Sequence, residues 1–248
     1  STPERQVDDM AHDIDVEHAA SELGCSDHEL VSFVGGGGKT ALMHAFARGL
    51  GGRCIATTTT QMGTGENGGL TTLIGASDDD IVAAATSGPT LVWRSVSDGK
   101  ALGMNPTRCN ALFDRVDHVL VEADGARSMP FKAPGTFEPV VASATTMMVS
   151  VIGADALGRI IADQCHRPLR VAALARCQPY QRLTPKAAAA VLLHPNGQRA
   201  ALPERARLVI AITKVEAVNA DFVEELTDEL DRLEPTVSVL SIAAFTSV

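Results

Sequence analysis

Residues 29–50 read ELVSFVGGGGKTALMHAFARGL. A short apolar run of β-prone residues, 29–34, meets four glycines, which are followed by a lysine, a threonine and a stretch of helical character. Successive glycines let backbone N–H groups turn toward an anion without obstruction by Cβ atoms, and a following helix presents its positive dipole end to the same anion. The order strand, glycine loop, helix therefore predicts a phosphate-binding loop. Its residues are Gly35, Gly36, Gly37, Gly38, Lys39 and Thr40.

Nucleotide phosphates are the expected guest of this loop. Lys39 would reach the β- and γ-phosphates, and the Thr40 hydroxyl would bind Mg²⁺. The common GxxxxGK[ST] pattern needs a glycine at the position of Phe33, so the match to it is incomplete. The shorter pattern GxxGKT does fit, from Gly35 onward, and resembles the nucleotide loop of the Mur ligases. A flexible glycine turn is the alternative, but the place between a strand and a helix favours phosphate binding.

The rest of the chain alternates strands with helices, which predicts an α/β three-layer sandwich with a mainly parallel sheet, similar to P-loop NTPases. We expect one nucleotide-binding α/β domain over residues 1–248, with 153–205 as a helical insertion or lid. The other predicted strands are 53–58, 71–74, 90–96, 118–123, 145–152, 207–212 and 237–242. The other predicted helices are 10–23, 78–85, 105–113, 168–177, 185–193 and 220–233.

Two carboxylates end an apolar strand in the segment VLVEADG, residues 119–125. Ligands of open α/β sheets bind outside the carboxyl ends of the strands, where Glu122 and Asp124 would lie. Either carboxylate could hold Mg²⁺, directly or through water, or polarise an attacking water. With Lys39 they are the candidate catalytic residues, and Glu122 is also a candidate Mg²⁺ ligand. The alternative is a loop carboxylate that caps a turn.

The segment AITKVE, residues 211–216, resembles the [NT]KxD signature with which GTPases recognise guanine. In that interpretation the stem of Lys214 stacks along the base and Glu216, in the place of the usual aspartate, accepts hydrogen bonds from it. A polar strand end that opens into the next helix explains the residues equally well. Arg127 and Lys132, in the loop after Asp124, could clamp an anionic substrate or could simply be solvated.

Composition excludes some classes of partner. The 248 residues carry a net charge of −9, which argues against binding to nucleic acid, because phosphate backbones need a surplus of Lys and Arg. No apolar stretch approaches the roughly 20 residues that cross a bilayer, and residues 1–10 are acidic and polar, unlike a signal peptide. We therefore expect no membrane partner and a cytoplasmic location. The five cysteines contain no CxxC pair and should be free thiols.

Several segments taken in order resemble one family. They are VSFVGGGGKTALM, IATTTTQM, VLVEADGARSMPFKAPGTFEPVV, SVIGADALG, CHRP and AITKVEAVN. This succession is similar to the selenium-dependent hydroxylase accessory proteins called YqeC, and the segment EADGxRxxPxKAPxxxEP is far more specific than a glycine loop. The resemblance implies a role in the maturation of selenium-dependent molybdenum hydroxylases, with such an enzyme or its cofactor as a partner.

Three functions remain open on the sequence. The first is an accessory protein that binds Mg²⁺ with ATP or GTP and hydrolyses the nucleotide. The second is an ATP-dependent ligase or phosphotransferase, which the GxxGKT loop suggests. The third is a non-catalytic module that uses the loop to hold a phosphate-bearing cofactor.

Overall fold

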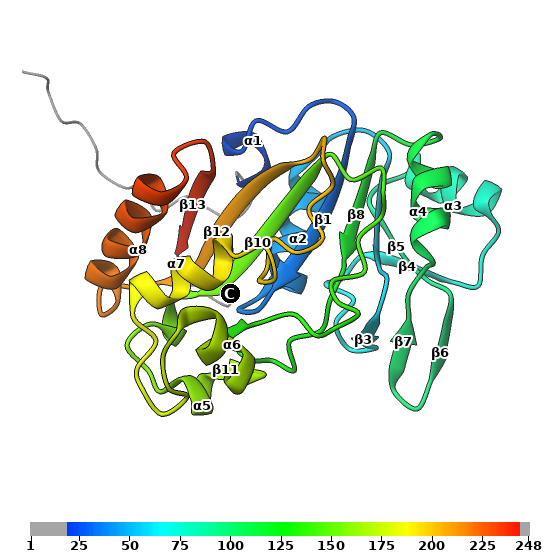
Figure 1. Ribbon diagram of the computed structural model, residues 1–248. Helices are drawn as coiled ribbons and strands as arrows, with labels where there is room; N and C mark the ends of the chain where they lie inside the picture. Colours follow the sequence, from blue (N-terminus) through cyan, green and yellow to red (C-terminus); the bar gives the residue numbers. More distant parts are fainter. Residues whose placement is uncertain (1–18, 244–248) are drawn as a thin grey trace, which may run out of the picture.

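A parallel sheet of eight strands forms the centre of the computed structural model, which describes residues 19–243 (Figure 1). The strand order is β13-β12-β10-β1-β8-β2-β5-β4, and each pair of neighbours runs parallel. The strands are β1 (Glu29–Gly35), β2 (Cys54–Thr58), β4 (Thr71–Ile74), β5 (Thr90–Trp93), β8 (His118–Glu122), β10 (Met147–Gly153), β12 (Arg207–Val215) and β13 (Ser238–Ala243). Because parallel strands need crossover connections, helices are brought onto both faces of this sheet.

Helices cover both faces, so the predicted three-layer α/β architecture is confirmed (Figure 1). One face packs against α1 and α2, and the other against α3 and α4 at one end and α7 and α8 at the other. The helices are α1 (Ala19–Glu22), α2 (Lys39–Gly49), α3 (Asp78–Ala85), α4 (Pro106–Phe113), α7 (Pro185–Leu193) and α8 (Ala220–Leu233). The part of the predicted helix 10–23 that precedes Ala19 lies outside the described residues.

The central strand β1 is buried along its whole length, and its side chains alternate between the two cores. Leu30 packs on the side of α3 and α4, whereas Val31 and Phe33 pack on the side of α2. The ring of Phe33 meets Phe46 of α2 edge to face, with 5.2 Å between the ring centroids. Phe33 is thus a core residue of the strand, and the glycine loop begins only after it.

Two small sheets lie at the carboxyl edge of the central sheet, and the sequence analysis did not predict either. One is antiparallel, with β3 (Gln61–Gly63), β6 (Ser95–Ser97) and β7 (Lys100–Leu102) in the order β3-β7-β6. It interrupts the predicted strand 90–96, because Arg94 leaves β5 and donates its N–H to Leu102 O. The other pairs β9 (Phe131–Lys132) with β11 (Cys165–His166).

The segment 153–205, expected to be a helical insertion or lid, contains four short helical pieces joined by loops. It holds the 3-10 turn η2 (Ala154–Ala156), α5 (Ile161–Gln164), α6 (Pro168–Ala175) and α7, together with β11. In Figure 1, α5, α6 and β11 lie on one side of the carboxyl edge and the β6–β7 hairpin on the other. A ligand at this edge would therefore lie between the two additions.

No helix within residues 19–243 is long and apolar enough to cross a bilayer. All five cysteines are free, as predicted.

Candidate functional site

The glycine loop is held in place by bonds from three neighbouring segments. Gly36 donates its N–H to Val151 O of β10 at 3.0 Å, and Gly37 donates to Met129 O at 3.1 Å. The hydroxyl of Thr213, at the end of β12, donates to Gly37 O. None of these bonds involves the first turn of α2. Its N-cap, Gly38 (φ 103°), has no side chain that could accept from the N–H groups of that turn. The first N–H groups of a helix have no intrahelical partner, so they are available to an anion.

Close contacts require glycine at several positions of the loop, Gly36 and Gly37 among them. A Cβ atom on Gly36 would lie 2.5 Å from Met129 O, and one on Gly37 would lie 2.2 Å from the backbone nitrogen of Gly153. Gly37 also has φ 82°, which residues with a side chain rarely adopt. The loop is therefore a fixed part of the fold and not a flexible glycine tether.

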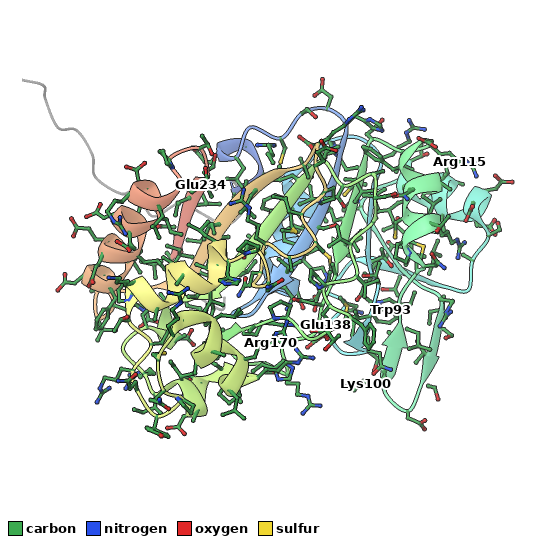
Figure 2. The ribbon with its side chains drawn as sticks, in the orientation of Figure 1. Trp93, Lys100, Arg115, Glu138, Arg170 and Glu234 are labelled. Atoms are coloured by element: carbon green, nitrogen blue, oxygen red, sulfur yellow. The ribbon has the colours of Figure 1, made fainter. Side chains whose placement is uncertain are left out.

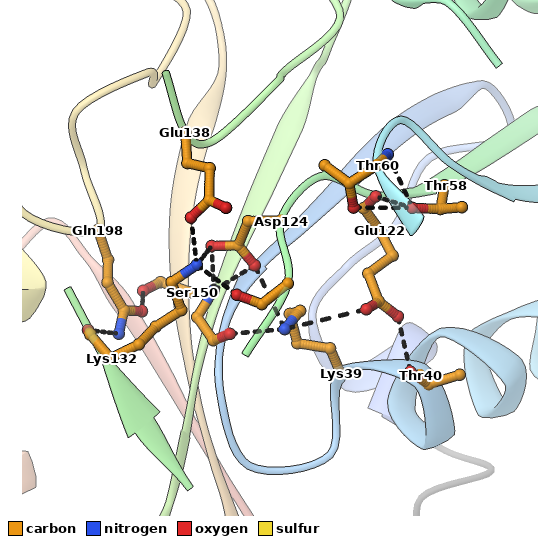
Figure 3. Close-up of polar contacts among 12 residues, drawn as sticks. Lys39, Thr40, Thr58, Thr60, Glu122, Asp124, Lys132, Glu138, Ser150 and Gln198 are labelled. Carbon is orange, nitrogen blue, oxygen red and sulfur yellow. Dashed lines mark hydrogen bonds and ion pairs between the residues drawn. The ribbon is translucent and has the colours of Figure 1, made fainter. Parts of the chain in front are cut away.

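Thr40 and Glu122 meet directly at the start of α2 (Figure 3). The Thr40 hydroxyl donates to Glu122 Oε2 at 2.6 Å, and Lys39 Nζ lies 4.0 Å from the other carboxylate oxygen. A hydroxyl after the loop lysine and a carboxylate at a neighbouring strand end are the protein ligands of Mg²⁺ in P-loop NTPases. Because Mg²⁺ takes its other ligands from water and phosphates, one hydroxyl and one carboxylate fit this ion.

Asp124 is the centre of a buried network that reaches back to the loop. Both of its carboxylate oxygens accept from Gly35 N, at 3.1 and 3.2 Å. Lys39 Nζ lies 3.2 Å from Asp124 Oδ1 and donates to Gly35 O at 2.6 Å, while Lys132 Nζ lies 3.0 Å from Asp124 Oδ2. Asp124 therefore fixes both the first glycine and the lysine of the loop.

The network continues through Lys132 to the helical segment. Lys132 is fully buried and donates to Glu138 at 2.8 Å and to Gly125 O at 2.6 Å. Glu138 in turn accepts from Arg167, the N-cap of α6, at 2.8 Å. Charges of alternating sign thus run from Glu122 through Lys39, Asp124, Lys132 and Glu138 to Arg167 (Figure 3 shows them as far as Glu138). This places Lys132 inside an ion network and away from the position of a substrate clamp.

The pKa values of two carboxyl groups in this network, Glu122 and Glu138, are shifted in opposite directions. Desolvation by burial raises the pKa of Glu122, and the nearby Lys39 charge and the Thr40 hydrogen bond only partly offset it. For Glu138, partial burial would also raise the pKa, but hydrogen bonds from Lys132 and Arg167, together with their charges, outweigh burial and lower the pKa to about 2. Glu138 is thus a firmly ionised partner for both cations.

A Glu138→Gln variant should show a weaker loss of stability in acid than the parent. The pKa of Glu138 is about 2 in the folded chain and about 4.3 in the unfolded chain, so the ionised carboxylate stabilises the fold above this range, and the stabilisation disappears as pH falls toward 2. Urea unfolding at steps from about pH 7 to about pH 2.5 should show a difference in free energy of unfolding that shrinks on acidification. Glu224→Gln, at an exposed position of α8, is the control; a Glu138→Gln difference that is constant with pH would contradict the prediction.

A cavity of about 810 Å³ opens in front of the loop. Its wall includes Lys39, Thr40 and Glu122 of the proposed Mg²⁺-nucleotide site, with Arg127 from the loop after β8 and Lys100 from β7. Neither Asp124 nor Lys132 lines it. Of the two cations that the sequence analysis singled out after Asp124, only Arg127 is therefore placed to contact a ligand here.

Lys214 and Glu216 lie at a second cavity, of about 800 Å³, on the β12 side of the loop. Lys214 lines both cavities, has φ 55° and forms an ion pair of 2.7 Å with Asp155. The pairing of β12 with β13 is irregular at this point, between Ile212 and Val215. The second cavity also contains the half-exposed ring of Phe222. Of the two residues proposed to read a base, Lys214 thus lies next to the phosphate loop, and Glu216 lines the second cavity.

Some participants gave no clear signal in the sequence. In the sequence, nothing distinguishes Glu138 and Asp155 from solvated carboxylates. The structure shows that Glu138 pairs with Lys132 and that Asp155 pairs with Lys214. Lys100 reaches the cavity through an antiparallel hairpin that the strand pattern did not reveal. Thr57, Thr58 and Thr59 lie at the carboxyl end of β2, near the site. Their hydroxyls donate to backbone carbonyls, so these threonines mainly stabilise the fold.

Comparison with known proteins places this site in a family. The model of the YqeC protein family matches residues 31–169, which include the glycine loop, Glu122, Asp124, Lys132 and Arg167. The uncharacterized protein YqeC of Escherichia coli (strain K12) is 31% identical over 195 residues, which is 75% of each chain. No solved structure gives a significant match. The segments that suggested the family in the sequence analysis fall mostly within the matched range, and the chain belongs to the YqeC family.

Proposed function

We propose that this protein binds a nucleoside triphosphate with Mg²⁺ at residues 35–40 and hydrolyses it, as an accessory protein in the maturation of selenium-dependent molybdenum hydroxylases. The contact between Thr40 and Glu122 carries the nucleotide part of the proposal, because it joins a loop hydroxyl to a strand-end carboxylate beside an uncapped helix. The accessory role rests on the resemblance of the family's segments, and the partner would be such a hydroxylase or its cofactor.

Each group of the loop has a defined task in this proposal. The open N–H groups of the first turn of α2 would bind phosphate oxygens, and Lys39 would exchange Gly35 O for a phosphate oxygen. Thr40 and Glu122 would hold Mg²⁺, which supplies positive charge to the phosphates. Catalysis would then be electrostatic, with Glu122 also able to orient water or metal, whereas buried Asp124 would position Gly35 and Lys39.

The base would extend toward the second cavity. Lys214 lines both cavities, so a base that extended from the phosphates toward Glu216 and Phe222 would pass beside it. The aspartate of the guanine-reading signature is a glutamate here, and both ATP and GTP remain candidate ligands.

The buried ion network provides a route from the nucleotide to a partner. Lys39 leaves Gly35 O and Asp124 when it takes a phosphate, and Asp124 is bonded through Lys132 and Glu138 to Arg167. Arg167 begins α6 in the helical segment 153–205. A change of charge at the loop would thus act on a segment that a partner could contact.

The first experiment is thermal unfolding of the full chain with ATP, GTP and CTP, each with and without Mg²⁺. A ligand that binds only the native state stabilises it by RT ln(1 + [L]/Kd), about 2.7 kcal/mol at 100 times Kd. We expect stabilisation by ATP or GTP that requires Mg²⁺, exceeds that by CTP and is lost in Lys39→Met. Phosphate release under the same conditions tests hydrolysis. No stabilisation by any nucleotide at millimolar concentration would overturn the proposal.

A further inference from the structure

The cavity in front of the loop extends beyond the place of the nucleotide phosphates, and this further inference rests on the proposed function. If Thr40 and Glu122 hold Mg²⁺ as proposed, the ion and the terminal phosphate would lie on the β8 side of the loop. Arg127, from the loop after β8, and Lys100, from β7, both line the cavity. The volume of about 810 Å³ is near the upper part of the range of roughly 300–1,000 Å³ for ligand pockets.

Arg127 lies at the tip of a turn with an unusual sequence. Ala126 O accepts from Met129 N at 3.0 Å, and the two central residues have positive φ, 51° for Arg127 and 59° for Ser128. These features identify a type I′ turn, which normally contains Asn, Asp or Gly because other residues are strained there. Among the described residues, this is the one adjacent pair of non-glycine residues with positive φ. Backbone strain of this kind is concentrated at functional sites.

The turn is fixed against the phosphate loop. On one side, the buried ammonium of Lys132 donates to Gly125 O at 2.6 Å. On the other, Gly37 N donates to Met129 O, and Gly153 N donates to Pro130 O at 2.8 Å. The strained conformation is therefore determined by its surroundings, and it projects Arg127 over the cavity from a rigid base.

Lys100 contributes a second cation from β7, across a different wall (Figure 2 labels Lys100 and Glu138 at this edge of the molecule). Within residues 19–243, neither Lys100 nor Arg127 has a hydrogen bond or ion pair through its side chain. Three carboxylates also line this cavity, and none forms an ion pair with either cation: Glu138 is paired with Lys132 and Arg167, Glu122 accepts from Thr40, and Glu66 accepts from Gly63 N. The two cations thus face the cavity without a counter-ion of their own.

We propose that Arg127, with Ser128 and Lys100, forms a binding site for a second ligand, a small molecule with a carboxylate or phosphate group, next to the terminal phosphate of the nucleotide. Arg127 supplies a planar, forked donor that suits either oxyanion, and Lys100 supplies a mobile point charge. The rigid turn presents the guanidinium before the ligand arrives, which reduces the ordering cost of binding. The site gives the protein a place for an acidic substrate beside the nucleotide.

The test is calorimetric titration of the full chain with two probes, inorganic phosphate and succinate, with sodium chloride at matched ionic strength as the blank. Each titration is run without nucleotide and with saturating Mg²⁺ and a non-hydrolysable analogue of the nucleotide that stabilises best. We expect one probe to bind, with about tenfold or greater loss of affinity in Arg127→Gln, as for removal of a hydrogen bond to a charged group, and a smaller loss in Lys100→Gln. Which probe binds distinguishes a phosphate from a carboxylate ligand.

Arg176→Gln is the matched control, because Arg176 is also exposed and has φ 54° but lies outside this cavity. It should bind the probe as the parent does. Affinity for the nucleotide analogue should change less than about threefold in Arg127→Gln, since the phosphate loop is intact. If the affinities for nucleotide and probe fall by comparable factors, Arg127 belongs to the nucleotide site and the inference is overturned. If no nucleotide binds, the proposed function fails, and the nucleotide-free titrations still decide this site. The proposed second site is overturned if neither probe binds the parent, or if a probe binds the parent and Arg127→Gln equally well.

Discussion

Lys132→Met should lose about 3–5 kcal/mol of its free energy of unfolding, because removal of one partner from a buried ion network leaves the others uncompensated. Lys132 is 0% exposed, and its ammonium lies 3.0 Å from Asp124 and 2.8 Å from Glu138. Methionine keeps the shape of the stem but offers no donor. Asp124 would retain Lys39, and Glu138 would retain Arg167, but Gly125 O would lose its bond. Among the substitutions considered, this one should have the largest effect on stability.

Urea unfolding of the parent and the variant at pH 7 measures this loss. Lys186→Met on α7 is the control, since Lys186 is exposed and a surface substitution of this kind changes stability by about 0.5 kcal/mol or less. An equal, small effect of both substitutions would show that the buried network contributes little, and would remove the proposed link between the loop and Arg167. If Lys132→Met is too unstable to purify alone, it is purified and unfolded in the presence of Mg²⁺ and nucleotide, and compared with the parent under the same conditions. Ligand binding should partly restore its fold.

The framework of the site could be predicted from sequence because its signals are local. A buried apolar strand, four glycines and Lys39-Thr40 follow one another in residues 29–40, and the structure has β1, the loop and α2 in those places. The apolar strand before Glu122 was equally clear. Parallel strands then bring their carboxyl ends to one edge, so Thr40 and Glu122 meet although 82 residues separate them.

The role of Lys132 could not be predicted in the same way. A lysine in a loop rich in glycine and proline is usually solvated, and its burial depends on β9 pairing with β11, a contact between distant segments only two residues long. The β3-β7-β6 sheet was missed for a related reason. Its strands are three residues each and largely exposed, so they carry little of the apolar alternation on which strand prediction depends. Lys100, and the part of the cavity wall that β3 and β7 form, were therefore not predicted either.

Phe33 shows where a motif can mislead without the fold. The long loop pattern needs glycine at this position, so the phenylalanine makes the match to that pattern incomplete. In the structure the ring fills the core against Phe46, and the chain leaves the strand only at the glycines. The shorter pattern, which starts at Gly35, is therefore the one that describes this loop.

Glu122→Gln should weaken the binding of Mg²⁺ together with the nucleotide, without lowering the stability of the free protein. Burial raises the pKa of Glu122, which means that the fold disfavours its ionised form and that the neutral amide removes this penalty. The hydrogen bond from Thr40 can be kept, because the amide oxygen accepts as the carboxylate does. Mg²⁺, however, prefers a charged oxygen ligand and loses it in this variant.

Thermal unfolding with a fixed concentration of the best nucleotide and increasing Mg²⁺ measures the effect. The Mg²⁺ concentration for half-maximal stabilisation should rise by about 10- to 100-fold or more in Glu122→Gln, the range found when groups that support a metal ligand are removed, whereas Glu224→Gln should match the parent. Thr40→Val should show the same rise, since it removes the other ligand and leaves the carboxylate. The combination matters: an unfolded or destabilised Glu122→Gln would mean that the carboxylate serves the fold, whereas a stable variant with the raised Mg²⁺ requirement shows that a costly buried charge is kept at this strand end for the metal.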